Sequence, residues 1–167
     1  MLFVRYVNIL MVIDMNKYYL EFLNELYLYI SEDDSNIWSD WIIKSRELFE
    51  KNNDLSYFLS AFGGMGSFND YYYENRETMP IVNVLKSITY SIANSIDNHQ
   101  NSTIEDIIIK ENERYIYNLK NGFNSEIAMQ EYEYLKYLKD NYNYSNLHNI
   151  NTKYSHQVLE NRKQSKR

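Results

Sequence analysis

The chain has 167 residues, which suits one domain with a conventional core, and its lack of cysteine excludes disulfide bonds, thiolate zinc sites and a cysteine nucleophile. The mean hydropathy of −0.59 excludes an integral membrane protein, and the net charge of −6 disfavours a nucleic-acid surface, which needs clustered Lys and Arg. We therefore expect a cytoplasmic protein that contacts neither nucleic acid nor membrane.

The negative charge is spread unevenly along the chain. Residues 153–167 hold five basic residues and one acidic residue, a net charge of +4, which leaves −10 on the rest of the chain. An acidic body suits a basic protein partner, although a modest negative charge is also what keeps a small domain in solution. The basic end either stays solvated or folds back on the acidic body.

Residues 1–14 are apolar but interrupted by Arg5 and Asn8, and they are too few to span a bilayer. Two interpretations remain open for this N-terminal extension: a short β-like segment, or a stretch that precedes the true start at Met15. From Met15 onward apolar residues recur at helical spacing, which predicts a helical domain over residues 15–140. The first helix carries an apolar face of Tyr19, Phe22, Leu23, Leu26 and Ile30.

Two more helices are predicted before the glycine-rich segment. Acidic residues 32–34 and Ser35 break the first helix and offer N-cap residues to the second. The second helix has two tryptophans on its apolar face, which is more typical of a core than of a ligand cage. The two apolar faces consist of Trp38, Trp41, Ile42, Leu48 and Phe49, then Leu55, Phe58, Leu59 and Phe62.

Two longer helices follow the glycine-rich segment. Pro80 suits a first helical turn and precedes an apolar face within residues 81–96. Thr103 and Asp106 have the spacing of a capping box, which predicts the start of the next helix. Residues 107–109 are strand-like, but no partner strand is evident, so we favour a helix there.

The C-terminal part contains one further predicted helix. Gly122 ends the preceding helix, and Ser125 or Asn124 caps the last one, whose apolar face includes Ile127, Tyr134, Leu135 and Leu138. Beyond Asn141 the pattern dissolves, so residues 141–167 are expected to form a loose polar and basic tail. No segment alternates as a strand, and the expected fold is all-α: a single domain built as an array of five to six amphipathic helices.

The most unusual local feature is a glycine-rich turn that holds three of the four glycines of the chain. In a structural interpretation, Gly63 takes the left-handed conformation that ends a helix, and Ser67 forms a capping box with Asp70 for a short helix through residues 71–73. In a functional interpretation, backbone N–H groups bind an anion or another small ligand beside Ser67 and Asn69. The candidate site residues are Gly63, Gly64, Met65, Gly66, Ser67, Asn69 and Asp70.

The structural interpretation is favoured because the known phosphate-binding loops are not matched. No Lys follows the glycines, so the segment is not a Walker loop. The pair Gly64 and Gly66 lacks a third glycine and follows a helix rather than a strand, so the dinucleotide fingerprint also fails. The negative charge of Asp70 would repel an anion.

A set of residues around this turn has a distinctive order: Trp38-x-x-Trp41, then Phe58-Leu59-x-x-Phe62, then Gly-Gly-Met-Gly-Ser-x-Asn-Asp at residues 63–70. This order resembles a family of small uncharacterised bacterial proteins, a domain of unknown function, over residues 37–73. The resemblance implies a bacterial-type cytoplasmic protein and brings no established activity or catalytic residue. The sequence departs from the expected pattern at residues 71–73, where three tyrosines replace smaller aliphatic residues.

No other residues form a catalytic or metal-binding constellation. Asp70 and Glu74 are four apart and could share a helical face, but such carboxylate pairs are more often solvated. His99 falls in a polar loop, and His148 and His156 fall in the expected tail, without the spacing of paired metal ligands. The sequence therefore predicts no cofactor and no metal, and it leans away from an enzyme.

These observations leave three functional hypotheses. The leading one is a non-enzymatic protein-binding module, in a specific form an immunity-type protein that neutralises a basic toxin, because nuclease toxins present Lys and Arg. The first alternative is a small-ligand, anion-binding or enzymatic site at the turn of residues 63–70. The second alternative is a structural domain that assembles as a homo-oligomer.

Overall fold

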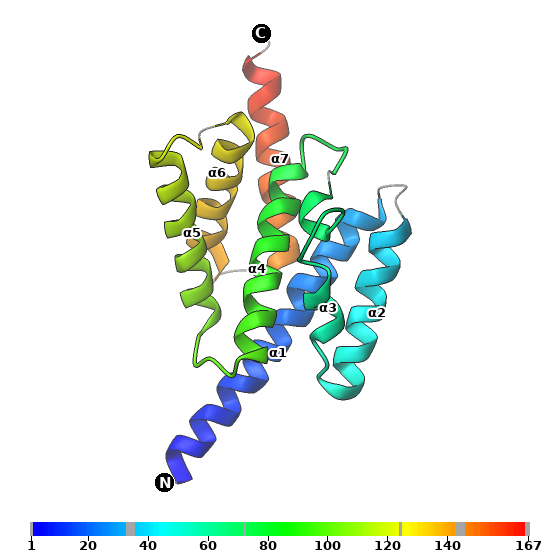
Figure 1. Ribbon diagram of the computed structural model, residues 1–167. Coiled ribbons are helices and arrows are strands. Elements are labelled where there is room, and N and C mark those ends of the chain that lie inside the picture. The colour runs from blue at the N-terminus through cyan, green and yellow to red at the C-terminus, as the bar shows by residue number, and fades with distance from the viewer. Residues whose placement is uncertain (1, 33–35, 72, 124, 143–145, 166–167) are drawn as a thin grey trace.

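The computed structural model describes residues 2–32, 36–71, 73–123, 125–142 and 146–165, and within these ranges it describes side chains except those of residues 2–14, 36 and 165. The described chain forms a single body of seven α-helices and one 3-10 turn without strands, so the all-α prediction is confirmed (Figure 1). The helices are α1 (Leu2–Ser31), α2 (Asn36–Asn52), α3 (Ser56–Ser60), η1 (Phe68–Asp70), α4 (Met79–Asp97), α5 (Ile104–Lys120), α6 (Glu126–Asn141) and α7 (Leu147–Ser165).

Helix α4 is the centre of the body (Figure 1), with α1 and α3 on one side and α5 and α6 on the other. It buries more than one stripe, because neighbours cover it from several directions. Pro80 stands in its first turn, as predicted, where the missing backbone N–H costs nothing. Its fully buried apolar side chains include Val82, Val84, Leu85, Ile88, Ile92 and Ala93.

Aromatic side chains pack α2, α3 and the following turn into one unit. The Trp41 ring stacks on Phe58 of α3 with centroids 5.1 Å apart and lies 5.2 Å from Phe68. The Trp38 ring lies 4.7 Å from Phe68. Both tryptophans are half-buried against the core, so the prediction that they serve the core is confirmed.

The helix ends around the α5–α6 hairpin follow local sequence signals. Thr103 and Asp106 form the predicted capping box, and the hydroxyl of Ser125 accepts a hydrogen bond from the Ala128 N–H. Gly122 takes a φ of +92° just beyond α5, a conformation that favours glycine. The strand-like residues 107–109 are helical, which confirms the choice of a helix there.

The suggestion of a β-like N-terminal extension is wrong. Residues 2–14 have helical backbone and continue into residues 15–31 as one helix, α1, which extends beyond the body at its N-terminal end (Figure 1). The stretch contains no proline or glycine to interrupt a helix. Within the described ranges, no helix combines the length and the apolar character needed to cross a membrane.

The expected loose tail over residues 141–167 is also wrong, because residues 147–165 form α7. The helix packs on α1 and α6 through its N-terminal half, where Leu147, Ile150 and Asn151 are buried. Most of its remaining residues are exposed, so its apolar periodicity is weak and the sequence pattern missed it. Two of the three histidines, His148 and His156, therefore stand on a helix rather than in a tail.

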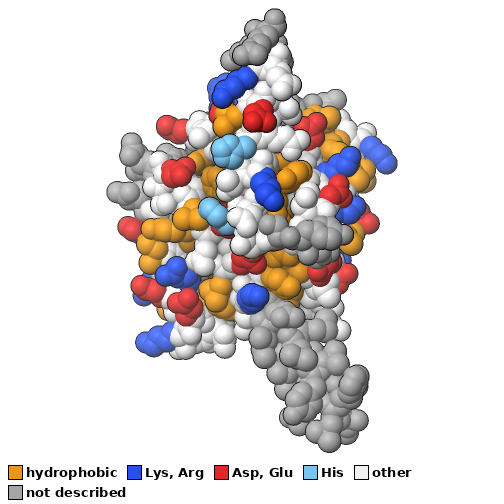
Figure 2. All heavy atoms as spheres, turned by 180° about the vertical axis from the view of Figure 1, so that it is seen from behind, with side chains coloured by type: hydrophobic (Ala, Val, Ile, Leu, Met, Phe, Trp, Pro, Cys, Tyr) orange, Lys and Arg blue, Asp and Glu red, His pale blue; other side chains and the backbone are white. Residues whose placement is uncertain are grey.

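The face opposite that of Figure 1 carries a mixed surface. Figure 2 shows acidic and basic side chains interspersed with hydrophobic ones there, together with histidine side chains. The negative charge of the body is therefore not gathered into one patch on this face.

Candidate functional site

The glycine turn lies between α3 and α4, and two of its glycines have a conformation that other residues rarely adopt. Gly64 and Gly66 have φ angles of +88° and +75°. Gly63 does not have a positive φ, so the prediction that it is the left-handed residue ending a helix is wrong. Helix α3 already ends at Ser60, and the left-handed positions come later in the turn.

Asp70 closes the turn in a way that differs from the predicted capping box. Its Oδ2 accepts a hydrogen bond of 2.9 Å from the Gly66 N–H, while the Ser67 side chain makes no capping hydrogen bond. The expected helix through residues 71–73 is replaced by the short 3-10 turn η1. Asp70 and Glu74 consequently share no helical face, and the suggested carboxylate pair is not formed.

The remaining predicted site residues divide between the surface and the core. Met65, at the tip of the turn, is fully exposed, and Asn69 is also exposed. Ser67 is buried, and its neighbour Phe68 donates a backbone hydrogen bond of 2.8 Å to the Ala61 carbonyl. The turn is therefore anchored at its base and open at its tip.

Lys86 of α4 holds the base of this turn, and sequence reasoning missed it. Its ammonium group donates hydrogen bonds to the carbonyl oxygens of Phe68 (3.3 Å) and Tyr71 (3.2 Å). It also lies 5.4 Å from the Phe68 ring centroid and 5.8 Å from that of Tyr71, within reach of cation–π attraction. A signal existed in the sequence, since Lys86 shares a helical face with Val82 and Ala93, both of them buried.

Lys86 also lines a polar cavity of about 390 Å³ beside the glycine turn. The turn contributes Phe62 and Asn69 to its wall, and α4 and α5 contribute the rest. Three segments far apart in the sequence thus meet around one space, with amide, hydroxyl and cationic groups on its surface. The α4 and α5 residues that line it are Asn83, Lys86, Ser87, Tyr90, Arg114 and Tyr115.

The other cation of the cavity, Arg114, is neutralised by a neighbour on its own helix. Its Nη2 lies 2.7 Å from Oε2 of Glu111 and also donates a hydrogen bond of 2.9 Å to the Ser87 hydroxyl. The Glu111 carboxylate accepts further hydrogen bonds from the hydroxyls of Ser87 and Ser91. This network joins α4 to α5 and satisfies both charges.

A third polar group, the Glu131 carboxylate of α6, lies close to the same region. It accepts a hydrogen bond of 2.6 Å from Asn83 and another from Tyr115. Burial raises the pKa of Glu131 despite these hydrogen bonds, and burial also raises the pKa of Tyr115. The Glu131 carboxylate is therefore engaged by side chains of α4 and α5 rather than paired directly with Lys86.

Burial lowers the pKa of Lys86 to about 8, while the more distant charges of Glu131 and Asp70 act in the opposite direction. Lys86 is only 7% exposed, and within the described residues no carboxylate lies within 4.0 Å of its ammonium group. Lys86 is thus a buried cation that is held by carbonyl dipoles and lacks a direct counterion. Such sites are enriched at binding and catalytic centres.

A larger hollow of about 680 Å³ lies at the other end of α4, near Ser95 and Met15. It adjoins residues 2–14, whose side chains are outside the described set, so the described residues alone do not bound it. Among the described side chains, no group of three or more His, Cys, Asp or Glu is placed to hold a metal ion. The cavity beside the glycine turn is therefore the best-defined candidate site.

Comparison with known proteins relates part of the chain to a family. Residues 31–80 match the family described as a domain of unknown function, DUF6966. The matched segment contains α2, α3 and the whole glycine turn, and it ends in the first turn of α4. The chain matches no curated protein and no solved structure.

Proposed function

We propose that this chain is a non-enzymatic binding protein that holds a small polar molecule in the cavity between the glycine turn, α4 and α5. The observation that carries this proposal is the position of Lys86, a buried cation on the wall of a polar cavity. A cavity of about 390 Å³ is at the lower end of the usual range of roughly 300–1,000 Å³ for ligand pockets, which suits a small molecule.

The glycine turn has a clear part in such a site. Its exposed tip leaves one wall of the cavity, at Asn69, accessible from solvent, and Lys86 fixes its base. We propose that the Gly-Gly-Met-Gly-Ser-x-Asn-Asp sequence of residues 63–70 is a recurring feature of the matched family, where it shapes this wall. We also propose that the chain is a member of this family and that it comes from a bacterium.

The test is a thermal-shift screen with amino acids, sugars, polyols and their phosphate esters. A ligand that binds the folded state raises the melting temperature, because binding stabilises it in proportion to ln(1 + [L]/Kd). The blocking variant Asn69→Tyr places a ring in the cavity from an exposed position. The matched control is Asn149→Tyr, at an asparagine on α7 that is also exposed.

We expect at least one polar compound to stabilise the parent and the Asn149→Tyr control but not Asn69→Tyr. Stabilisation that survives Asn69→Tyr would place the ligand elsewhere. If no compound of these classes stabilises the parent, the proposal fails.

Binding of a basic protein partner is the second candidate function. It is favoured because some exposed carboxylates of the described chain have no basic side chain beside them. Five of them, Glu25, Glu47, Glu50, Glu77 and Glu111, lie within 4.0 Å of a basic group. Among the described residues, Glu105 and Glu113 on the exposed side of α5 have no such partner. An immunity-type protein that neutralises a nuclease toxin would use unpaired carboxylates of this kind.

Calorimetric titration with basic nuclease domains at low and high salt tests this candidate. Binding should weaken with salt and with the double charge reversal Glu105→Lys and Glu113→Lys. Binding that is insensitive to both would contradict it.

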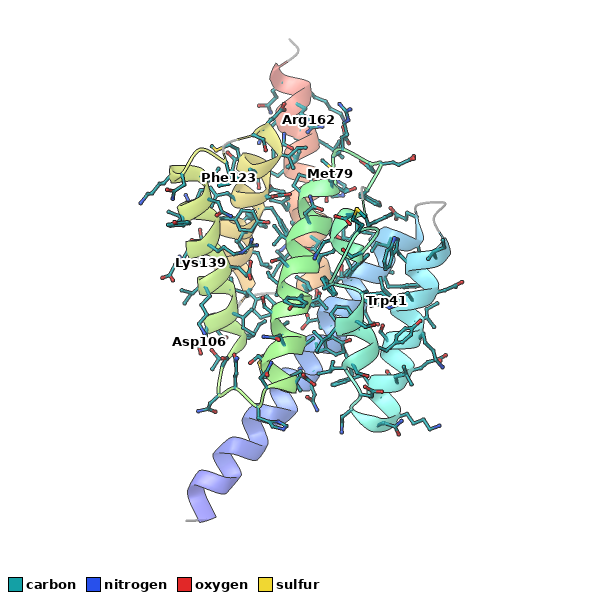
Figure 3. All side chains as sticks on the ribbon, viewed as in Figure 1. Trp41, Met79, Asp106, Phe123, Lys139 and Arg162 are labelled. Atoms are coloured by element: carbon teal, nitrogen blue, oxygen red, sulfur yellow. The ribbon has the colours of Figure 1, made fainter. Side chains whose placement is uncertain are left out.

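Homo-oligomerisation is the competing interpretation of the exposed apolar residues on the α5–α6 hairpin. Phe123, at the turn between these helices (Figure 3), is 69% exposed, and Tyr117 is 67% exposed. Light scattering distinguishes a monomer of 20.2 kDa from an assembly. A mass near 20.2 kDa across a wide concentration range would contradict a homo-oligomer.

A further inference from the structure

We infer that the ligand of the cavity beside the glycine turn carries a negative charge, in a carboxylate or phosphate group, that pairs with the ammonium group of Lys86. This inference rests on the proposed function and adds the chemical class of the ligand. The hydrogen bonds and charges around Lys86, on each element packed against it, support the inference.

The ammonium group of Lys86 is incompletely satisfied by the protein. A lysine ammonium has three N–H donors, and two of them go to the carbonyl oxygens of Phe68 and Tyr71. Within the described residues, no third hydrogen-bond partner is present for this group, and the side chain lines the cavity. We take this remaining donor as the one that would meet a ligand.

The charge of Lys86 is also incompletely balanced. From the turn, Asp70 acts on it only at a distance, and its Oδ2 is occupied by the Gly66 N–H. From α6, Glu131 accepts a hydrogen bond from Asn83 and also acts on Lys86 without a direct ion pair. A buried charge without a close partner costs free energy, which an incoming anion would offset.

Arg114 of α5 does not compete for this role. Glu111 already neutralises it through a contact of 2.7 Å, and the Ser87 hydroxyl takes a further hydrogen bond from it. The repulsion that Asp70 exerts on an anion is limited, because Asp70 is exposed and its field is screened by solvent. Of the cationic groups that line the cavity, Lys86 is the one without a direct counterion.

The other lining groups restrict the rest of the ligand. Asn69 offers an amide and Tyr90 a hydroxyl, whereas Asn83 and Tyr115 are already engaged by Glu131. The cavity therefore suits a molecule that bears hydroxyl, amino or amide groups beside its anionic group. Its volume of about 390 Å³ suits a small molecule. The ligand class is a small, polar organic anion.

Binding of such an anion is linked to the protonation of Lys86. The anion favours the ammonium form, so it raises the pKa of Lys86 above its value of about 8 in the free protein. Affinity is then nearly constant below this pKa and falls above it, approaching about tenfold per pH unit. A neutral ligand of the same shape produces neither effect.

The experiment follows the side-chain resonances of the full chain labelled with carbon-13 in lysine and with nitrogen-15 in asparagine. Matched charged and neutral probes are titrated: acetate against acetamide, and glycerol 3-phosphate against glycerol, with inorganic phosphate as a fifth probe. The Lys86 signal is assigned by its loss in Lys86→Arg. Lys110, exposed on α5, is the internal control in the same spectra.

We expect acetate, glycerol 3-phosphate or phosphate to raise the Lys86 pKa while acetamide and glycerol leave it unchanged, and we expect Lys110 to be unaffected by all five. The acetate and phosphate arms decide between a carboxylate and a phosphate ligand. Since these measurements use the parent chain, they do not depend on how well a Lys86 variant folds.

Two negative results are distinguishable. If neutral probes shift the amide signals of Asn69 and Asn83 while the anions leave the Lys86 pKa unchanged, the cavity binds ligands but the anionic class is wrong. If no probe perturbs Asn69, Asn83 or Lys86, both the anionic class and the proposed function fail.

Discussion

The carboxylate of Asp70 accepts a hydrogen bond of 2.9 Å from the backbone N–H of Gly66, and this contact closes the glycine turn on itself. The φ of +75° at Gly66 turns the chain back toward Asp70. Lys86 braces the same segment from α4 through the carbonyl of Phe68. The turn is therefore fixed by an acid within it and by a base from the helix beneath it.

Gly66→Ala should lower the free energy of unfolding by about 1–2 kcal/mol, because an L-residue pays roughly this amount in the left-handed region. The space around an added Cβ is open, so the whole effect comes from the backbone conformation. Gly63→Ala is the matched control, since its surroundings are equally open but its φ is not positive. Urea denaturation checks the pair, and equal losses in both variants would contradict the assignment.

Asp70→Ala should destabilise the protein by about 1 kcal/mol, the usual contribution of a hydrogen bond to the backbone. Asp70→Asn retains an acceptor for the Gly66 N–H and should cost less. Both variants should also lower the pKa of Lys86 further, since Asp70 is one of the charges that raises it. Glu74→Ala, an exposed residue outside η1, should change neither stability nor that pKa. An unchanged Lys86 pKa in both Asp70 variants would refute the electrostatic link.

Lys86→Met should change the pH dependence of stability in a defined window. Burial lowers the Lys86 pKa from 10.5 to about 8, so between these values the unfolded chain binds a proton that the folded chain does not. Stability of the parent relative to Lys86→Met therefore rises from pH 8 to 10.5, by at most about 3 kcal/mol, and is flat below pH 8. Denaturation curves across this range test it, with Lys110→Met as the exposed control. A flat difference throughout the window would be evidence against a buried, uncompensated lysine.

Asn151→Leu should loosen α7 and cost about 2–3 kcal/mol. The buried Asn151 accepts a hydrogen bond of 2.5 Å from the Tyr134 hydroxyl and donates one of 3.1 Å to Glu25. Its removal leaves the buried Tyr134 hydroxyl without this acceptor and leaves Glu25, among the described residues, with only its contact to His148. Asn149→Leu lies two residues away on the exposed side and should be close to neutral. Hydrogen exchange of the α7 amides provides the measurement, and similar protection in the two variants would rule out this docking role.

Local sequence signals predicted most of the helices and several of their ends. Thr103 and Asp106 form a capping box because both partners lie within one helical turn, and the N-cap of α6 at Ser125 has the same local origin. The apolar residues of α4 recur at helical spacing, and this spacing predicted the buried face of the helix. The prediction succeeds because the spacing involves only residues that are close together in the sequence. The sequence also located the glycine turn, though not which glycines would be left-handed.

Only the tertiary structure decided the partners of the polar residues. Asp70 has the spacing of a capping residue, yet it binds the Gly66 N–H because the turn brings that group to it. The exposed helix α7 is held by Asn151 and by the Glu25 carboxylate of α1, more than a hundred residues away in the chain. Lys86 meets the Phe68 carbonyl, and the cavity forms, only when α4, α5 and the turn pack together. Periodicity records which residues are apolar, whereas contacts between distant polar groups depend on the packing of whole helices, so the candidate site appears only in the folded chain.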